Sequence, residues 1–280
     1  MSRPEHKAPP EIFYNEEEAR KYTTNSRIQS VQAEMSLRAL ELLNLPDETC
    51  FLLDIGCGSG LSGEILDDEG HIWIGLDISP SMLQVALDRE VEGDLFLQDI
   101  GQGMNFRPGT FDGAISISVL QWLCNADQQS HNPKSRLTRF FSTLYASLKR
   151  GARAVFQLYP ENDDQCELIM NVAMRCGFEG GLVVDYPNSK KAKKYYLCLF
   201  AGQIPGGQKQ QIPQALGEEK EEHDVIYSNQ RIRERQKGKQ RKSVKNRDWV
   251  LHKKEVARTR GKKDVPFDSK YTGRKRRPKF

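Results

Sequence analysis

A short apolar run that ends in an acid and three alternating glycines constrains this chain more than any other feature. Residues 51–60 read FLLDIGCGSG, and helix-compatible sequence follows from Leu61 to Glu69. Glycine has no Cβ and tolerates positive φ, so the turn can be tight and a ligand can approach its backbone closely. The order of strand, glycine loop and helix is typical of the nucleotide-binding corner of a doubly wound α/β sheet.

The spacing of the glycines separates two kinds of nucleotide site. A dinucleotide fingerprint, G-x-G-x-x-G, needs glycine at the sixth position counted from Gly56, but that position is Leu61. A second copy begins at Gly58, two residues too late for the strand. The form D-x-G-x-G-x-G instead resembles the first motif of class I methyltransferases, which use S-adenosylmethionine (SAM).

The resemblance to that motif implies contacts with SAM. Asp54 is expected to face the methionine end of the cofactor, where an acid suits the ammonium group. For this loop taken alone, a purely structural strand-to-helix turn is the alternative. The loop residues expected to bind the cofactor are Gly56, Cys57, Gly58 and Gly60.

Two later strands also end in an acid. Residues 71–77 end in Asp77, which lies 21 residues after Gly56. An acid at about that distance sits at the tip of the second strand, where it can bind both ribose hydroxyls. Ser79 and Pro80 then begin a helix, and apolar side chains there can pack on adenine. We therefore expect Ile78 and Met82 to contact the cofactor.

The third strand, residues 95–100, contains Asp99 near its end. In the methyltransferase pattern Asp99 accepts a hydrogen bond from the adenine amino group, and the backbone of Ile100 contacts the ring. An ordinary turn acid is the alternative for Asp99. Three strand-end acids in succession are more specific than any one of them alone.

The rest of the pattern completes an α/β domain. We predict a Rossmann-like class I methyltransferase fold, with a seven-stranded, mostly parallel sheet, helices on both faces and a helix-free last pair of strands. The further strands are expected at 111–118, 152–159, 182–187 and 195–200, and helices at 12–45, 133–148 and 161–176. The helix at 12–45 either covers the cofactor or simply packs on the sheet.

Charge divides the chain. Residues 228–280 hold 21 Lys and Arg against 5 Asp and Glu, which leaves 21 against 33 in the other residues. An acidic body with a basic tail is typical of a domain that carries a nucleic-acid-binding or targeting segment. We expect a disordered N-terminus (1–11), a methyltransferase domain (12–202), a linker (203–227) and a basic C-terminal region, or tail (228–280).

Composition excludes several other classes. The six cysteines include no C-x-x-C pair, so neither a zinc ribbon nor a disulfide framework is indicated. Reduced thiols fit a cytosolic or nuclear protein. No apolar run approaches the length that crosses a membrane, so we expect no membrane partner. No metal-ligand spacing appears, so no metal site is expected.

The sequence lacks the motifs of several methyltransferase reactions. Exocyclic-amine methyltransferases carry an N/D-P-P-Y loop after the fourth strand, where this chain has residues 116–119, SISV. Carbon-5 pyrimidine methyltransferases use a Pro-Cys nucleophile, and no Pro-Cys occurs. Guanine N7 has a free lone pair at neutral pH, so its methylation needs mainly alignment of the two reactants.

Residues just past the fourth and fifth strands are candidates for the active site. Ser116 is expected to contact the cofactor, and Ser118 and Gln121 to form the floor of the site. Trp122 and Tyr159 are the aromatic side chains best placed to stack on a splayed-out base. The alternative is that both are core aromatics.

Five segments together resemble the eukaryotic 18S rRNA (guanine-N7)-methyltransferase family: residues 53–58, 75–80, 115–123, 185–189 and 271–276. The resemblance implies methylation of 18S rRNA during small ribosomal subunit (pre-40S) biogenesis, in the nucleolus and nucleoplasm and also in the cytoplasm. It also implies a heterodimer with a small zinc-binding methyltransferase activator subunit. Helix-free strands near a sheet edge offer such a partner unpaired backbone groups.

Two other functions stay open at this point. A small-molecule SAM methyltransferase has similar loops, although the basic tail argues against it. A ribosome-assembly factor that binds RNA and acts mainly as a scaffold is the second alternative.

Overall fold

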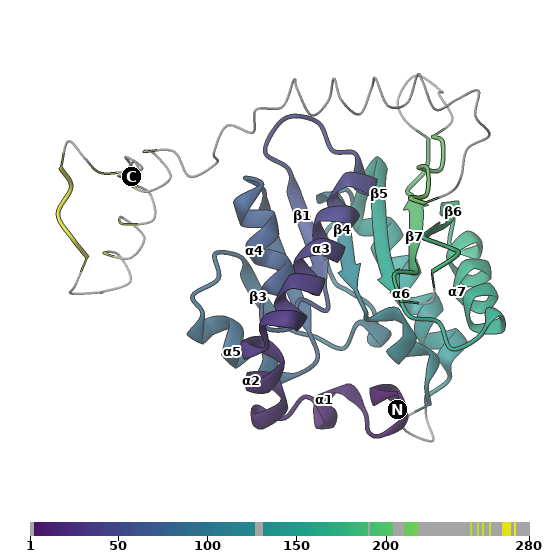
Figure 1. The fold of residues 1–280 in the computed structure, drawn as a ribbon. Coiled ribbons are helices and arrows are strands. Elements are labelled where there is room, and N and C mark those ends of the chain that lie inside the picture. The colour runs from purple at the N-terminus through teal and green to yellow at the C-terminus, as the bar shows by residue number, and fades with distance from the viewer. Residues whose placement is uncertain are drawn as a thin grey trace. The chain divides into compact units, whose positions relative to one another are not determined.

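The computed structural model describes residues 3–126, 131–189, 191–203, 210–217, 247, 251, 254, 258, 265–269 and 272. The chain divides into two compact units, residues 1–67 with 71–218, and residues 68–70 with 219–280. The first unit contains a seven-stranded sheet with helices on both faces (Figure 1). The expected Rossmann-like α/β fold is therefore confirmed.

The strand order of the sheet reverses between β1 and β4. Its order is β3-β2-β1-β4-β5-β7-β6, and only β7 is antiparallel to its neighbours. Ligands bind where the strand order reverses in such sheets, at the carboxyl ends of the strands. The bounds are β1 (Phe51–Ile55), β2 (Ile72–Asp77), β3 (Asp94–Leu97), β4 (Phe111–Ile117), β5 (Leu148–Leu158), β6 (Glu179–Asp185) and β7 (Lys194–Phe200).

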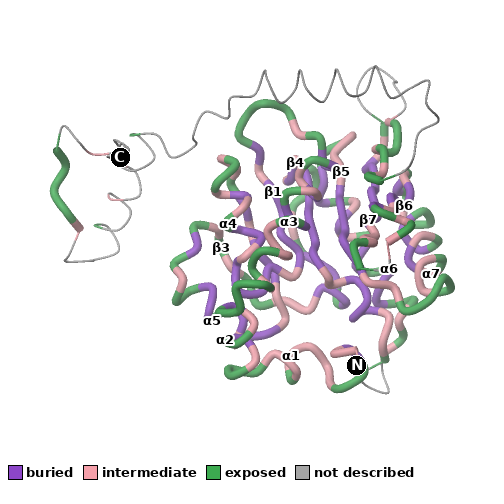
Figure 2. The backbone as a smooth tube through the Cα atoms, in the orientation of Figure 1, coloured by how far each residue is buried: buried purple, intermediate pink, exposed green. Residues whose placement is uncertain are grey.

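Two apolar cores hold the helices against the sheet. On one face the core contains residues of α3 (Ser26–Leu43), α4 (Leu61–Asp68) and α5 (Pro80–Asp88). On the other face it contains residues of α6 (Pro133–Ser147) and α7 (Asp163–Arg175). The central strands are buried along most of their length (Figure 2), as expected for parallel strands covered on both faces.

The N-terminal helical region is broken twice. The sequence predicts one helix over residues 12–45, but the structure has α1 (Pro10–Phe13), α2 (Glu16–Thr24) and α3. Asn15 accepts a hydrogen bond from the Glu18 N–H at 3.0 Å, and Asn25 accepts two from the first turn of α3. Asparagine is a strong N-cap, so each asparagine begins a new helix.

Residues 3–9 form structure where disorder was expected. The short helix η1 (Pro4–His6) follows Arg3, whose guanidinium donates to the carbonyl oxygens of Tyr159 at 2.7 Å and Pro160 at 2.8 Å. Asn125 donates to the Glu5 carbonyl at 3.2 Å. Figure 1 shows this segment (purple) passing below the lower ends of the strands. These contacts join residues far apart in the sequence, so local composition does not reveal them.

Part of the expected linker, 203–227, packs against the domain. Residues 210–217 are held at Asp185, whose Oδ1 accepts a hydrogen bond from the Leu216 N–H at 2.8 Å. The Arg38 guanidinium from α3 binds both oxygens of the same carboxylate, at 2.8 and 3.1 Å. The Asp185 and Arg38 side chains are only 3% and 10% exposed. A buried ion pair therefore fixes the segment that follows β7.

The second unit is described at only a few positions. Asp268 forms ion pairs with Lys254 Nζ at 2.9 Å and with an Arg258 guanidinium nitrogen at 3.0 Å. The hydrogen bonds from these two cations lower the pKa of Asp268. Most of the basic region, 228–280, lies outside the described residues.

Candidate functional site

A cavity lies where the carboxyl ends of β1 and β2 meet, under the N-terminal segment. It has a volume of about 240 Å³. Parallel strands end at the same edge, so residues from four strand ends come together here. The expected site residues that line it are Gly56, Cys57, Gly58, Asp77, Ile78, Met82, Asp99, Ile100, Ser118 and Trp122.

The glycine loop passes close to Val119, two residues after the end of β4. Gly56 has φ +73°, and a Cβ there would lie 2.1 Å from Cγ2 of Val119. Gly58 also has positive φ, at +55°. The N–H groups of Gly56 and Cys57 both donate to the Leu76 carbonyl, at 2.7 and 3.0 Å. The strand end of β2 therefore holds the loop in place.

Asp77 is fixed by backbone donors on both sides. Its Oδ2 accepts from the Gly58 N–H at 2.8 Å, and its Oδ1 from the Ser79 N–H at 2.8 Å. Burial raises the pKa of this carboxyl, while the same backbone hydrogen bonds oppose the rise. Each carboxylate oxygen accepts about two hydrogen bonds, so Asp77 keeps acceptor capacity for two ligand hydroxyls.

Asp54 lies beneath the cavity, rather than in its wall as the sequence predicts. Its side chain is fully buried; Oδ2 accepts from Ser62 Oγ at 2.6 Å, and Oδ1 has no partner among the described residues. Ser62 lines the cavity and is the group between Asp54 and a ligand. Burial raises the pKa of Asp54 to about 7.

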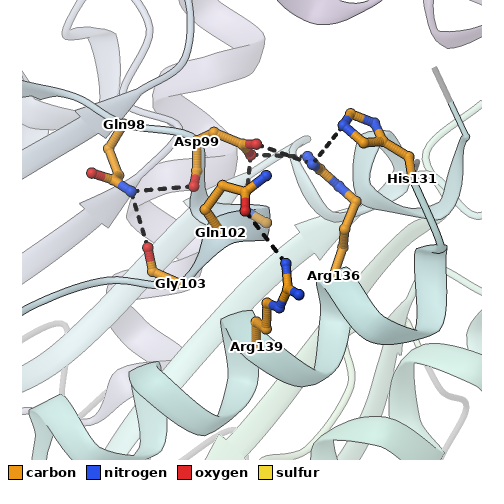
Figure 3. A network of polar contacts seen from close by, with 8 residues as sticks. Gln98, Asp99, Gln102, Gly103, His131, Arg136 and Arg139 are labelled. Carbon is orange, nitrogen blue, oxygen red and sulfur yellow. Dashed lines mark hydrogen bonds and ion pairs between the residues drawn. The ribbon is translucent and has the colours of Figure 1, made fainter. Parts of the chain in front are cut away.

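Asp99 is engaged by an arginine that the sequence did not indicate. Figure 3 shows Arg136, from α6, pairing with both oxygens of Asp99 at 2.9 and 3.0 Å. The Gly101 N–H also donates to Asp99 at 2.9 Å. Bidentate pairs of this kind fix the plane of the carboxylate. Asp99 Oδ2 accepts only the Arg136 hydrogen bond among these contacts, so Asp99 is oriented by Arg136 and keeps capacity to accept from an adenine amine.

Two polar side chains extend this network along the cavity wall. His131 Nε2 lies 3.3 Å from an Arg136 nitrogen, and its Nδ1 is buried without a partner among the described residues. Gln98 donates through its amide nitrogen to the carbonyls of Asp99 and Gly103. His131 and Gln98 both line the cavity.

An aromatic cluster from the N-terminal segment covers the cavity. Tyr14 lies 5.9 Å from both Tyr22 and Trp122, measured between ring centroids, and Phe13 lies 6.0 Å from Trp122. Ser79 Oγ donates to the Tyr14 carbonyl at 2.8 Å, which ties this cluster to the end of β2. Burial, followed by the charges of Asp77 and Glu5, raises the pKa of Tyr14. The helix expected as a cover or a packing element therefore does both.

Two of the expected substrate residues turn away from the cavity. The Tyr159 hydroxyl accepts from Lys194 Nζ at 2.9 Å and contacts Met35 Sδ at 3.4 Å, so Tyr159 does not line the cavity. Gln121 is buried and donates to the Ser118 carbonyl at 2.9 Å. The expectation that Tyr159 stacks on a base is therefore not supported by its position.

Three further residues that were expected in the site are Ser118, Ser116 and Gly60, and only Ser118 lines the cavity. Ser118 lines the cavity with φ +63°, and its hydroxyl donates to Gln157 Oε1 at 2.7 Å. Ser116 is fully buried and donates to the Ile55 carbonyl at 2.8 Å, so it supports β1 instead of contacting a ligand. Gly60 is buried at the start of α4 and does not line the cavity.

The sequence reasoning missed residues that reach the cavity from other elements. A serine six residues after Gly56 in a glycine loop was a visible signal for Ser62, but no local pattern marks Arg136 in the first turn of an amphipathic helix. The cavity-lining residues that were not predicted include Glu11, Tyr14, Tyr22, Gln32, Ser62, Gln98, His131 and Arg136.

The charges in the wall indicate the class of ligand. Glu11, Asp77 and Asp99 are acidic, whereas Arg136 is already paired with Asp99. A pyrophosphate normally meets free N–H groups or cations, so a dinucleotide is disfavoured. A nucleoside that carries positive charge, with ribose near Asp77 and its charged end near Ser62 and Asp54, fits these residues.

The described residues contain no metal-ligand cluster, no helix able to span a membrane and no disulfide bond. No three His, Cys, Asp or Glu side chains there come together as metal ligands. Within the same ranges, no helix combines the length and the apolar character needed to cross a bilayer. The six cysteines are free thiols.

Family models match two parts of the chain. A model described as "Methyltransferase domain" matches residues 53–156, which include the glycine loop and three strand ends. A model described as "Methyltransferase involved in Williams-Beuren syndrome" matches residues 199–278.

Full-length relatives share one printed name. The chain is 57% identical over 283 residues to the 18S rRNA (guanine(1575)-N(7))-methyltransferase of Saccharomyces cerevisiae, with 100% of each chain covered. It is 55% identical over 282 residues to the 18S rRNA (guanine-N(7))-methyltransferase of Mus musculus, which covers 99% of this chain and 98% of that protein.

Solved structures are similar at lower identity. A TehB-like SAM-dependent methyltransferase from Corynebacterium glutamicum has a TM-score of 0.48 and 18% identity, over 68% of this chain and 100% of that chain. A Haloferax volcanii methyltransferase solved with the Trm112 methyltransferase activator has a TM-score of 0.46 and 16% identity, over 66% and 98%.

Replacing Asp77 with alanine is expected to weaken SAM binding about tenfold or more. Removing the charged acceptor of a ligand hydroxyl weakens the binding free energy by roughly 1.5–3 kcal/mol. Titration calorimetry on the purified Asp77→Ala variant measures this loss. Asp94→Ala, an exposed acid at the other end of the neighbouring strand β3, is the matched control. Unchanged SAM affinity in a folded Asp77→Ala protein would contradict the assignment.

Proposed function

The chain belongs to the family of 18S rRNA (guanine-N(7))-methyltransferases, and from that premise we propose that it transfers a methyl group from SAM to N7 of a guanine in 18S rRNA. The observation that carries the proposal is 52–57% identity to six relatives of that name, each over 99–100% of this chain. The Magnesium-protoporphyrin and ubiquinone O-methyltransferases match only 30% and 41% of it. A small-molecule substrate is therefore less well supported.

The residues of the cavity bind and align the two reactants. SAM, when bound, supplies a methyl group on a positively charged sulfur. The backbone at Gly56 and Gly58 allows close approach, and Asp77 accepts from the ribose hydroxyls. Arg136 holds Asp99 at the adenine end. Alignment of this kind can lower a barrier by on the order of 7–11 kcal/mol.

The chain needs no strong base or nucleophile for this reaction. Guanine N7 carries an unprotonated lone pair at neutral pH, so no proton has to leave before the methyl group is transferred. Cys57 lines the cavity, but burial raises the pKa of its thiol well above the ordinary value. A thiol in that state is a poor nucleophile. This supports direct transfer over a covalent cysteine mechanism.

Trp122 is the aromatic side chain best placed to hold the guanine. It lines the cavity after β4 and packs against Phe13 and Tyr14 from the covering segment. A base splayed out of RNA is commonly stacked on such a ring. Closing the segment over the base would exclude water from the transfer.

Trp122→Ala is expected to reduce N7 methylation of 18S rRNA roughly 5- to 150-fold, because one base stack contributes about 1–3 kcal/mol. A reverse-transcription stop map of N7-methylguanine, with the wild type, the variant or no protein, measures this. SAM affinity of the variant, measured separately, identifies indirect effects on the cofactor.

Two outcomes of that map would count against different parts of the proposal. Equal methylation by the wild type and Trp122→Ala would remove Trp122 from the base site. If the wild type binds SAM tightly but leaves no N7-methylguanine in 18S rRNA, the scaffold function is favoured over catalysis.

We propose that the activator subunit, a small zinc-binding protein, covers the β3 edge of the sheet. The sequence analysis expected the activator to bind the helix-free strands, which lie at the opposite edge of the sheet. Residues 210–217 already bind there, at the end of β6. At β3, Phe96 and Leu97 are 48% and 60% exposed. Exposed apolar groups on an open strand edge favour a protein partner.

Phe96→Asp is expected to abolish stable heterodimer formation, because a charge on that edge opposes burial of the apolar patch. Co-purification of the two subunits, followed by size-exclusion chromatography, is the measurement. Met174→Asp, an exposed apolar position on α7, is the control. A heterodimer of wild-type stability with Phe96→Asp would move the interface elsewhere, and a stable, fully active isolated chain would argue against any required activator.

We propose two roles for the basic region 228–280, contact with rRNA phosphates and nuclear import, in a protein that acts in the nucleolus and nucleoplasm during pre-40S maturation. Its 21 Lys and Arg support phosphate contact. The run Lys275-Arg276-Arg277-Pro278-Lys279 suits an import signal, although it lies outside the described residues.

Deleting residues 228–280 is expected to flatten the salt dependence of RNA binding while SAM affinity stays unchanged. For single-stranded RNA, log affinity falls against log salt with a slope of about −0.7 for each phosphate contacted. Binding assays at several salt concentrations give the slope, and fluorescence microscopy of the deletion gives the localisation. An unchanged slope with loss of nuclear signal would leave import as the only role.

A further inference from the structure

The turn between β6 and β7 lies at the same edge of the sheet as the cavity. Because β7 is antiparallel to β5, its first residues lie beside the carboxyl end of β5, with Tyr195 opposite Leu158. Lys194 lies opposite Asp185, the last residue of β6. Neighbouring strands are about 4.8 Å apart, so the start of β7 is about 10 Å from the end of β4, where the cavity begins.

This turn presents lysines without acidic partners. Lys191 is exposed and Lys193 half-buried, and neither forms an ion pair with any carboxylate in the part of the chain that the structure describes. Lys193 Nζ lies 4.8 Å from the ring centroid of Tyr195. Lys194 Nζ lies 5.0 Å from the ring centroid of Tyr159 and donates to its hydroxyl. Aromatic rings therefore hold the cations in place without neutralising them.

A fourth cation, Arg3 of the N-terminal segment, lies beside the residues that follow β5. Arg3 donates to the carbonyls of Tyr159 and Pro160, which are neutral acceptors, so its charge is not cancelled. Two neighbouring acids have other partners: Glu161 lies 3.4 Å from His6 Nε2, and Asp185 pairs with Arg38. In the part of the chain that the structure describes, no carboxylate therefore forms an ion pair with Arg3 or with the three lysines.

We propose that Lys191, Lys193, Lys194 and Arg3 form a phosphate-binding rim that holds the backbone of the RNA strand beside the target guanine. The proposal rests on the proposed function, because it assumes an RNA substrate whose base enters the cavity. Phosphates position an RNA strand without reading its sequence, whereas the cavity selects the base. Lysines spaced next to tyrosines also match the mixture of cations and aromatic rings that binds single strands.

The rim differs from the basic region in what it does. A basic tail adds affinity wherever it meets RNA, but the rim is attached to the same sheet edge as the cavity. It therefore sets the register of the strand relative to the methyl-transfer position. Loss of the rim is expected to raise the KM for RNA and to lower the yield of N7-methylguanine, with the affinity for SAM unchanged.

The test compares two double variants of the full chain, purified with its activator if the isolated chain is insoluble. Lys191→Ala with Lys193→Ala removes two rim cations. Arg107→Ala with Arg150→Ala removes two exposed cations near the amino ends of β4 and β5, at the opposite edge. Binding to an 18S rRNA transcript is measured at several salt concentrations, and SAM binding is measured by calorimetry.

The rim variant is expected to reduce the magnitude of the salt slope by about 1.4, from two lost phosphate contacts, while the control keeps the wild-type slope. An unchanged slope in the rim variant, or an equal change in the control, would overturn the rim. These results are separable from the proposed function, which fails only if the wild-type protein leaves 18S rRNA without N7-methylguanine.

Discussion

The hydrogen bond from the Gly58 N–H to Asp77 Oδ2 is the contact on which the site depends. It joins the loop after β1 to the last residue of β2, and two further N–H groups of the loop bind the Leu76 carbonyl. The loop is thus shaped by the neighbouring strand before any ligand arrives. Such preorganisation spares the protein the cost of ordering the site during binding. The same residue that holds the loop also offers acceptor capacity to the ligand.

The features that were predictable from the sequence are those with a local signal. Apolar runs mark the seven strands, glycines at alternate positions mark the loop, and each strand-end acid lies at the cofactor edge or directly beneath it. Arg136 and Arg3 were not predictable, because their partners are 37 and 156 residues away. A guanidinium that binds a distant carboxylate or carbonyl leaves no periodic pattern in the sequence.

Two errors share a physical cause. Tyr159 was expected at the base because it follows a strand, yet its hydroxyl contacts Lys194 and Met35, and its side chain does not line the cavity. Residues 203–227 were expected to be a linker because they contain little to bury, yet Asp185 binds the backbone at Leu216. Strand-end position identifies an edge of the sheet, but the direction of a side chain depends on its neighbours. Likewise, backbone groups can anchor a segment that has few apolar residues.

The anchoring of residues 210–217 at Asp185 shortens the stretch of chain that connects the sheet domain to the basic region 228–280. A tethered binding segment meets its target at an effective concentration that depends on the length of chain between the two binding elements. That length is counted from Leu216, whose N–H binds Asp185, and not from Phe200 at the end of β7. With the RNA-binding role proposed for residues 228–280, a shorter tether would raise the local concentration of the basic residues around an RNA bound at the domain. The buried Arg38–Asp185 ion pair, which lies outside the cavity, would then contribute to avidity.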